Sequence, residues 1–161
     1  MENVKAELRS MLGEFDINLN KLLYSDLPED TFANRITKAK LMADISQEKL
    51  YKAVGLSRTT INELEAGYRD TPTKDTLLKL LTVLDRNILC DDYCKFILDQ
   101  ENIINQLIST YGIKELSNRI NVHRSTIERW RDGKNQIKRN YYNLLKECFP
   151  IGKVTKVTKK N

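Results

Sequence analysis

The sequence has few of the residues that build tight β-turns, with only six glycines and three prolines among 161 residues. Apolar residues instead recur every three to four positions along most of the chain, which is the spacing of an amphipathic helix. We therefore expect an all-α protein. No apolar run approaches the roughly 18 residues typical of a transmembrane helix. Since no signal-peptide pattern opens the sequence either, we expect a cytoplasmic protein with no membrane contact.

Histidine and cysteine are equally scarce. The only histidine is His123, which argues against catalysis by a Ser-His or Cys-His pair. The three cysteines, Cys90, Cys94 and Cys148, are an odd number with no obvious fourth ligand, so structural thiols are favoured over a metal or redox site. Clustered carboxylates and a glycine-rich phosphate loop are also lacking. We expect no enzyme activity, no cofactor and no metal site, and no small-molecule ligand is evident.

Acidic and basic residues are unevenly distributed. Residues 1–30 hold three basic and seven acidic side chains, and residues 89–110 hold one and four. Residues 31–88 hold ten basic against seven acidic, residues 111–150 nine against four, and residues 151–161 four against none. An excess of positive charge is expected where a protein meets nucleic-acid phosphates, although ordinary solvated faces explain the charge equally well.

A near-repetition 66 residues apart is the most informative feature that is present. Residues 58–61 read Arg-Thr-Thr-Ile and residues 124–127 read Arg-Ser-Thr-Ile. Six apolar and turn positions around them recur at the same offset, which we interpret as two copies of one supersecondary unit. In the first copy these are Leu50, Gly55, Leu56, Ile61, Leu64 and Gly67, and in the second Leu116, Asn121, Val122, Ile127, Trp130 and Gly133.

The first copy is predicted to form two short helices joined by a tight turn. Ser46 can cap a helix over residues 47–54, because its hydroxyl can accept from an unpaired backbone amide. Gly55 can take the positive φ of the turn that follows. Ser57 can then cap a helix over residues 58–66. This arrangement is typical of a helix-turn-helix motif.

The second copy follows the same pattern. We predict helices over residues 113–120 and 124–132, with Asn121 in the turn, since asparagine tolerates positive φ better than most residues. His123 lies at the capping position of the second helix. Trp130 aligns with Leu64 of the first copy and is therefore expected in the core.

Residues 31–86 resemble the Cro/repressor (XRE-type) helix-turn-helix family. The resemblance is carried by residues 46–50 (Ser-Gln-Glu-Lys-Leu), 54–58 (Val-Gly-Leu-Ser-Arg), 61–67 (Ile-Asn-Glu-Leu-Glu-Ala-Gly), 71–73 (Thr-Pro-Thr) and 77–81 (Leu-Leu-Lys-Leu-Leu). It implies an ion pair between Lys40 and Glu65 and a phosphate contact by Gln47. Its base-edge contacts fall on Arg58, Thr59 and Glu63. Residues 111–148 resemble helix-turn-helix domains more loosely, so the expected fold is two λ-repressor-like helical units in tandem, joined by a helical connection.

Residue chemistry extends these contacts to the second copy. Arg58 and Arg124 take the first exposed position of their helices, where arginine can bind guanine O6 and N7 together. Ser125 offers a hydroxyl, and Arg129 lies one turn further along. Glu63 could accept from cytosine N4, or it could simply neutralise Arg58 or nearby lysines. Phosphate contacts are expected from Gln47, Tyr68, Arg69, Lys134, Asn135 and Gln136.

The chain is expected to divide into five segments. Helices over 2–13 and 17–25 form an acidic N-terminal region, residues 1–30, that packs on the first domain or on another chain. Residues 89–110 form a helical connector of one helix or two, with Asp99 as the cap of the second. The remaining segments are a first helix-turn-helix domain (31–88, including helices 31–43 and 74–85), a second unit (111–150, ending in helix 136–148) and a basic, disordered tail (151–161).

The predicted function is a sequence-specific regulator of transcription that binds double-stranded DNA, as a homodimer or with both helix-turn-helix units of one chain. In the alternative, one unit is a protein-docking or dimerisation module, as in an antitoxin or phage-type regulator, and only the other binds DNA. The first unit is the candidate for that role, because its recognition helix has mixed charge. In addition, Tyr51 stands where the resembled family usually has a small residue.

Overall fold

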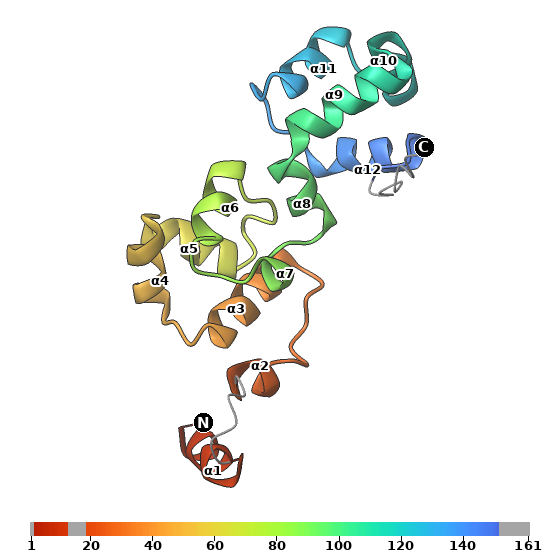
Figure 1. Ribbon diagram of the computed structural model, residues 1–161. Coiled ribbons are helices and arrows are strands. Elements are labelled where there is room, and N and C mark those ends of the chain that lie inside the picture. The colour runs from red at the N-terminus through yellow and green to blue at the C-terminus, as the bar shows by residue number, and fades with distance from the viewer. Residues whose placement is uncertain (1, 13–18, 152–161) are drawn as a thin grey trace, which may run out of the picture. The chain divides into compact units, whose positions relative to one another are not determined.

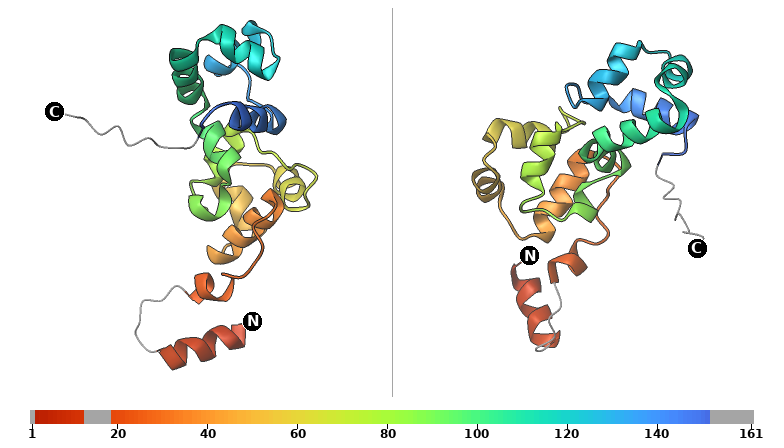
Figure 2. Two further views of the ribbon diagram at one scale, coloured as in Figure 1. Left: turned by 90° about the vertical axis from the view of Figure 1, so that its right-hand side faces the viewer. Right: turned by 45° about the horizontal axis from the view of Figure 1, so that its top comes forward.

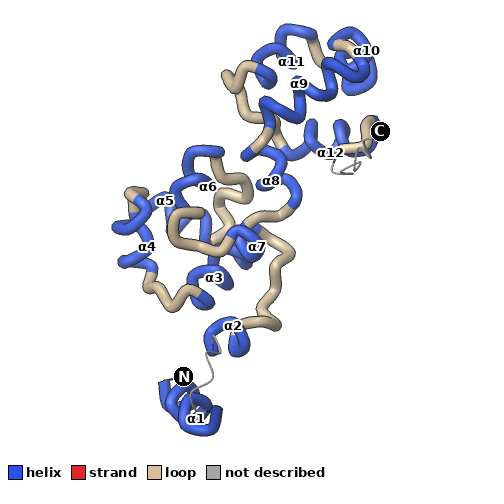
Figure 3. Tube along the Cα trace, in the orientation of Figure 1, coloured by secondary structure: helices blue, strands red, loops and turns tan. Residues whose placement is uncertain are grey.

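The computed structural model describes residues 2–12 and 19–151, and every regular element in these ranges is an α-helix (Figures 1 and 3). The expectation of an all-α protein is confirmed. The chain divides into two compact units, residues 1–91 and residues 92–161. Each unit is described by itself below. Among the described residues, no helix combines the length and the apolar character that crossing a membrane requires.

The first unit is built around helix α3, which packs against α5 and α7. Its most deeply buried side chains are apolar and come mainly from α3 to α7, among them Ile36, Leu50, Ile61, Leu77 and Leu89. The helices of this unit are α1 (Glu2–Leu12), α2 (Leu19–Leu23), α3 (Phe32–Met42), α4 (Gln47–Val54), α5 (Arg58–Glu65), α6 (Lys74–Leu80) and α7 (Arg86–Leu89).

Local capping chemistry sets where three of these helices begin. Thr31, Ser46 and Ser57 each have extended backbone, and each side-chain oxygen accepts from the amide three residues further on, at 3.1 to 3.2 Å. Such caps satisfy amides that a helix leaves unpaired at its start. Ser46 and Ser57 were predicted as caps from the sequence.

A buried ammonium group attaches the segment before α3 to the first unit. Lys38 is only 5% exposed, and its Nζ donates to the carbonyls of Ser25 (2.6 Å) and Leu27 (3.1 Å) and to Glu29 Oε1 (2.7 Å). Arg35 contacts the other oxygen of Glu29 at 3.4 Å. The hydrogen bond from Lys38 lowers the pKa of the Glu29 carboxyl below its ordinary value. The segment before α3 is thus attached by a buried cluster of polar groups that are paired with one another.

The predicted helix over residues 74–85 is too long. Helix α6 ends at Leu80, because the Thr82 hydroxyl donates to the carbonyl of Lys79 (2.7 Å) and the chain tightens into a turn. Asp85 then caps α7 through the amide of Asn87 at 2.8 Å. Leu84, which lies beyond the end of α6, is nevertheless buried.

Only part of the acidic N-terminal region can be compared with the prediction, since residues 13–18 lie outside the described residues. Lys5 of α1 donates to Asp44 Oδ1 at 3.1 Å. Val4 and Met11 of α1 are 47% and 82% exposed, although both side chains are apolar. Apart from Ile151, the predicted basic tail also lies outside the described residues.

The second unit includes most of the segment that we predicted to be a connector. Two helices, α8 (Asp92–Leu98) and α9 (Gln100–Tyr111), cover it, and α9 packs against α10 (Ile113–Ile120) and α11 (Arg124–Arg131) (Figure 2). Tyr93, Cys94, Ile97 and Ile104 are at most 1% exposed. These apolar groups form part of the core of the second unit, which begins at residue 92. Asp99 precedes α9 without capping it.

The last helix, α12 (Arg139–Cys148), starts three residues later than the predicted helix over 136–148. Its buried side chains are Tyr142 and Leu145, whereas Leu144 is 38% exposed. Ile137, inside the predicted helix, is buried, but its amide and its carbonyl bond to side chains of α9 and α8 and cannot join α12. The start of α12 is therefore displaced toward the C-terminus.

Gln100 is the group that fixes the chain between α11 and α12. It is 3% exposed, and its Nε2 donates to the carbonyls of Trp130 (3.0 Å) and Asn135 (2.9 Å). Its Oε1 accepts from the amide of Ile137 at 2.8 Å. The Tyr93 hydroxyl donates to the carbonyl of Ile137 at 2.8 Å. Four hydrogen bonds from side chains of α8 and α9 thus hold residues 130–137 in place.

We predict that Lys38→Met destabilises the protein by about 2–4 kcal/mol, because it leaves two carbonyls and a carboxylate without their buried donor. The matched control is Lys49→Met, at an exposed position of α4, which should change stability by no more than about 0.5 kcal/mol. Urea unfolding of the full chain, followed by circular dichroism, measures both. Equal losses for the two variants would contradict the assigned role of Lys38.

We also predict that Gln100→Leu, a substitution of similar volume, costs the second unit about 2–4 kcal/mol, because two carbonyls and an amide lose their partners. Gln106→Leu on the exposed side of α9 is the control. Trp130 is the only tryptophan and lies in this unit, so its fluorescence during urea unfolding reports the transition. A Gln100→Leu midpoint equal to that of the control would show that these hydrogen bonds add nothing to stability.

Candidate nucleic-acid interface

The two predicted helix-turn-helix pairs, α4–α5 and α10–α11, have the same helical geometry. Helices α4 and α5 have eight residues each, and so do α10 and α11. The turn residue of each pair is left-handed, Gly55 with φ 66° and Asn121 with φ 52°. The prediction that Asn121 takes a positive φ is confirmed.

Burial follows the same register in both pairs. The exposed fraction is 0% for Leu50 and Ile61 of the first pair and for Leu116 and Ile127 of the second. Trp130 is 3% exposed, at the position of Leu64, so its predicted place in the core is confirmed. With one side of α5 and α11 facing the core, their remaining residues must face outward.

The outward side of α5 begins with exposed Arg58 and Thr59. Within residues 2–12 and 19–151, Arg58 has no hydrogen bond or ion pair. Glu63, one turn later, is paired with Arg69 at 2.6 Å (Glu63 Oε2 to Arg69 Nε). Glu63 is therefore neutralised by Arg69, and not by the Arg58 or lysine partners that we had considered. The Arg69 side chain, expected at a phosphate, is engaged in the same pair.

The ion pair that the family resemblance implied between Lys40 and Glu65 is present, with Lys40 Nζ 2.5 Å from Glu65 Oε1. The other oxygen of Glu65 accepts from the side-chain amide of Gln47 at 2.5 Å. Glu65 therefore joins α3, α4 and α5. Since a glutamine amide has two N–H groups, Gln47 keeps one donor for a further acceptor.

The outward side of α11 carries Arg124 and Arg129, both exposed. Neither has an ion pair among the residues that the structure describes. His123 takes the capping position, as predicted, and its Nδ1 accepts from the Ser125 amide at 3.3 Å. The Ser125 hydroxyl lies 2.7 Å from the same nitrogen. The two arginines are thus available to a ligand, while Ser125 is engaged at the helix start.

The three residues expected to contact phosphate after α11 differ in their exposure and in their contacts within the protein. Lys134 is exposed and lies 3.7 Å from Asp132 Oδ2, and a hydrogen bond from Arg131 lowers the pKa of Asp132. Asn135 is exposed, with its carbonyl held by the second unit's interior. The Gln136 amide donates to the Tyr93 hydroxyl at 3.3 Å. Of the three predicted phosphate contacts, Gln136 therefore faces inward.

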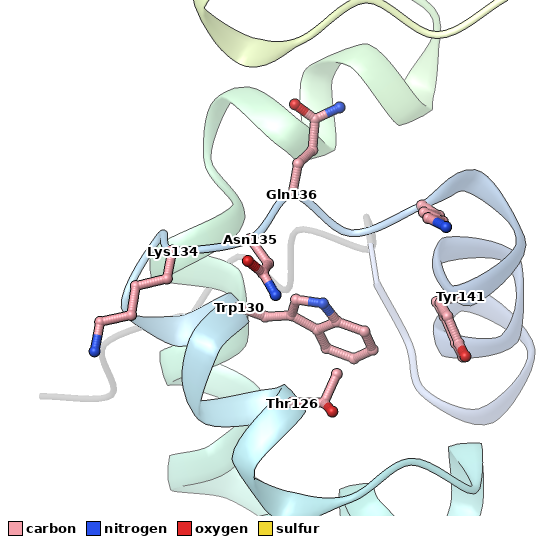
Figure 4. Close-up of a pocket in the computed structure, with 7 residues that line it drawn as sticks. Thr126, Trp130, Lys134, Asn135, Gln136 and Tyr141 are labelled. Atoms are coloured by element: carbon pink, nitrogen blue, oxygen red, sulfur yellow. The ribbon is translucent and has the colours of Figure 1, made fainter.

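An open cleft of about 450 Å³ lies beside α11 and was not predicted from the sequence. Figure 4 shows the indole of Trp130 at its centre, with Thr126 and Tyr141 near the ring. Its lining residues are Thr126, Trp130, Lys134, Asn135, Gln136, Lys138 and Tyr141. In the sequence, only the cluster of amide and basic residues after Gly133 pointed to this cleft. The part of the wall that α12 contributes depends on tertiary packing and has no local sequence pattern.

Comparison with known proteins bears on the first unit. Residues 36–89 match a family model described as Helix-turn-helix. The matched span starts within α3 and ends with α7, so it contains the pair α4–α5. The comparisons with curated proteins and with solved structures gave no match. Residues 36–89 are therefore a helix-turn-helix domain of the Cro/C1 (XRE) type, a family of DNA-binding transcription regulators.

Proposed function

We propose that this protein is a sequence-specific transcriptional regulator that places α5 and α11 in the major groove of double-stranded DNA. The main support is the shared register of the two helix pairs, which leaves Arg58 and Arg124 exposed at the start of their helices. That position is where helix-turn-helix proteins meet base edges. The family match supports the proposal for the first unit, and the equivalent helices of the second unit extend it.

Base contacts in this proposal follow from donor geometry. Arg58, Arg124 and Arg129 can each bind the O6 and N7 acceptors of a guanine. Thr59 is exposed and can present its methyl group to thymine. Glu63 can accept from cytosine N4 only if Arg69 releases it, since the two are paired without DNA. Ser125 must similarly share its hydroxyl with His123.

Phosphate contacts would fix the register of each helix on the duplex. Tyr68, which is 85% exposed, and Arg69 follow α5. Lys134 and Asn135 follow α11 at the equivalent place. Gln47 has one amide hydrogen left for a phosphate oxygen after its contact with Glu65. Gln136 would have to turn from its contact with Tyr93 to reach a phosphate. Such contacts carry no sequence information by themselves.

A second candidate function is that the first unit docks a protein, a second copy of this chain included, while only the second unit binds DNA. The exposed Val4 and Met11 of α1 favour it, because an amphipathic helix normally buries such side chains. The charge of α5 favours it as well, since Arg58 is outnumbered there by Glu63 and Glu65. A dimer that forms without DNA would support this alternative.

We predict that Arg124→Ala lowers affinity for the preferred duplex about tenfold, since a bidentate arginine–guanine contact is worth roughly 1–3 kcal/mol. The duplex would first be selected from a random pool at a stated salt concentration. Affinity for random duplexes should change much less. Lys134→Ala should weaken both kinds of duplex by a similar factor. Titrations that show equal losses on specific and random DNA for both variants would contradict the assignment.

We predict that Arg58→Ala relaxes selectivity at base pairs different from those affected by Arg124→Ala, because the two arginines belong to separate recognition helices. Repeating the selection with each variant measures this directly. Arg86→Ala, at an exposed position of α7, is the control and should leave selectivity unchanged. If Arg58→Ala behaves like the control and gel filtration shows a dimer without DNA, the first unit is a docking module.

A further inference from the structure

We propose that the cleft beside α11 is a phosphate-binding site, and that the indole N–H of Trp130 is one of its donors. The proposal extends the proposed function, because the phosphate can belong to the backbone of a duplex or to a free phosphate compound. The same donors could bind either kind of phosphate, so the experiment must distinguish a duplex from a free phosphate compound.

The first argument is the composition of the lining. The residues that line the cleft carry hydroxyl, amide, indole and ammonium groups, and none of them carries a carboxylate. Lys138 and Tyr141 have no hydrogen bond or ion pair from their side chains to other described residues. Figure 4 shows the Asn135 amide beside the indole ring, while Lys134 extends away from it at the edge. A site with donors and without acids selects an anion.

The second argument is the unpaired indole. Trp130 is 3% exposed and lines the cleft, and its N–H has no hydrogen-bond partner in the described part of the chain. The indole nitrogen is not among the fully buried atoms that lack a partner, so its N–H remains accessible. Leu64 fills the equivalent core position of the first unit with no polar group. Core packing therefore explains the size of the Trp130 side chain, and an anion in the cleft can accept from its N–H in place of water.

The third argument is size and position. A volume of about 450 Å³ is in the range of small-molecule sites, roughly 300–1,000 Å³, and exceeds what a bare phosphate ion needs. The cleft therefore has room for a sugar–phosphate unit. Its wall includes Thr126 of α11 and the segment that Gln100 holds in place, so a phosphate bound there lies beside the recognition helix.

Trp130 itself provides the measurement, since it is the only tryptophan in the protein. The full chain is titrated with inorganic phosphate, with chloride replaced to keep ionic strength constant, and separately with the selected duplex. We expect saturable changes of Trp130 fluorescence in both titrations. Asn135→Ala and Lys138→Gln should each raise the phosphate concentration at half saturation by about tenfold, as expected for loss of a hydrogen bond to a charged group.

The controls are Asn143→Ala and Lys95→Gln, at exposed positions of the same unit that do not line the cleft. They should titrate like the original protein. A phosphate response that is absent, or that the cleft variants share equally with the controls, would overturn the proposal. A labelled duplex provides the independent check. If the duplex binds while the fluorescence of Trp130 responds neither to the duplex nor to phosphate, the cleft proposal fails and the proposed function stands. If no duplex binds but phosphate does with the expected variant losses, the cleft takes a free phosphate compound and the proposed function fails.

Discussion

Helices of eight residues are too short to be stable alone in water, so α4, α5, α10 and α11 depend on the burial of one side of each. That burial is complete at Leu50 and Ile61 in the first unit and at Leu116 and Ile127 in the second. Helical periodicity then determines which residues face outward. Packing of the core is thus what brings Arg58 and Arg124 to the surface, because neither arginine has a partner of its own among the described residues.

The two units hold their helix pairs with different polar groups. In the first, Lys38 supports the segment before α3, and Glu65 joins the helix pair to Lys40. In the second, Gln100 supports the segment after α11. Helix α3 begins with buried Phe32 and α9 with buried Gln100. A buried phenyl ring needs no hydrogen-bond partner, whereas a buried amide does. Because Gln100 finds its partners in residues 130–137, the first residue of α9 determines the path of the chain up to α12.

Features that depend on adjacent residues could be predicted from the sequence, and features that depend on distant partners could not. Caps such as Ser46 and the left-handed Asn121 follow from local chemistry. The start of α12 does not, since Ile137 is withheld from the helix by Gln100, 37 residues earlier. The same division applies to the candidate site. The helical position of Arg124 was evident, but the inward turn of Gln136 depends on Tyr93, 43 positions away.

Equal geometry would not make α5 and α11, the two proposed recognition helices, equal partners for DNA. Glu63 and Glu65 are each matched by a basic side chain within the first unit, which leaves Arg58 as the cation that α5 can offer a phosphate or a guanine. Helix α11 offers Arg124 and Arg129 without such competition. Because affinity for DNA at low salt comes mainly from released counterions, the second unit would supply more of it. The first unit would then contribute chiefly through the fit of its side chains to base edges, or through contacts with protein.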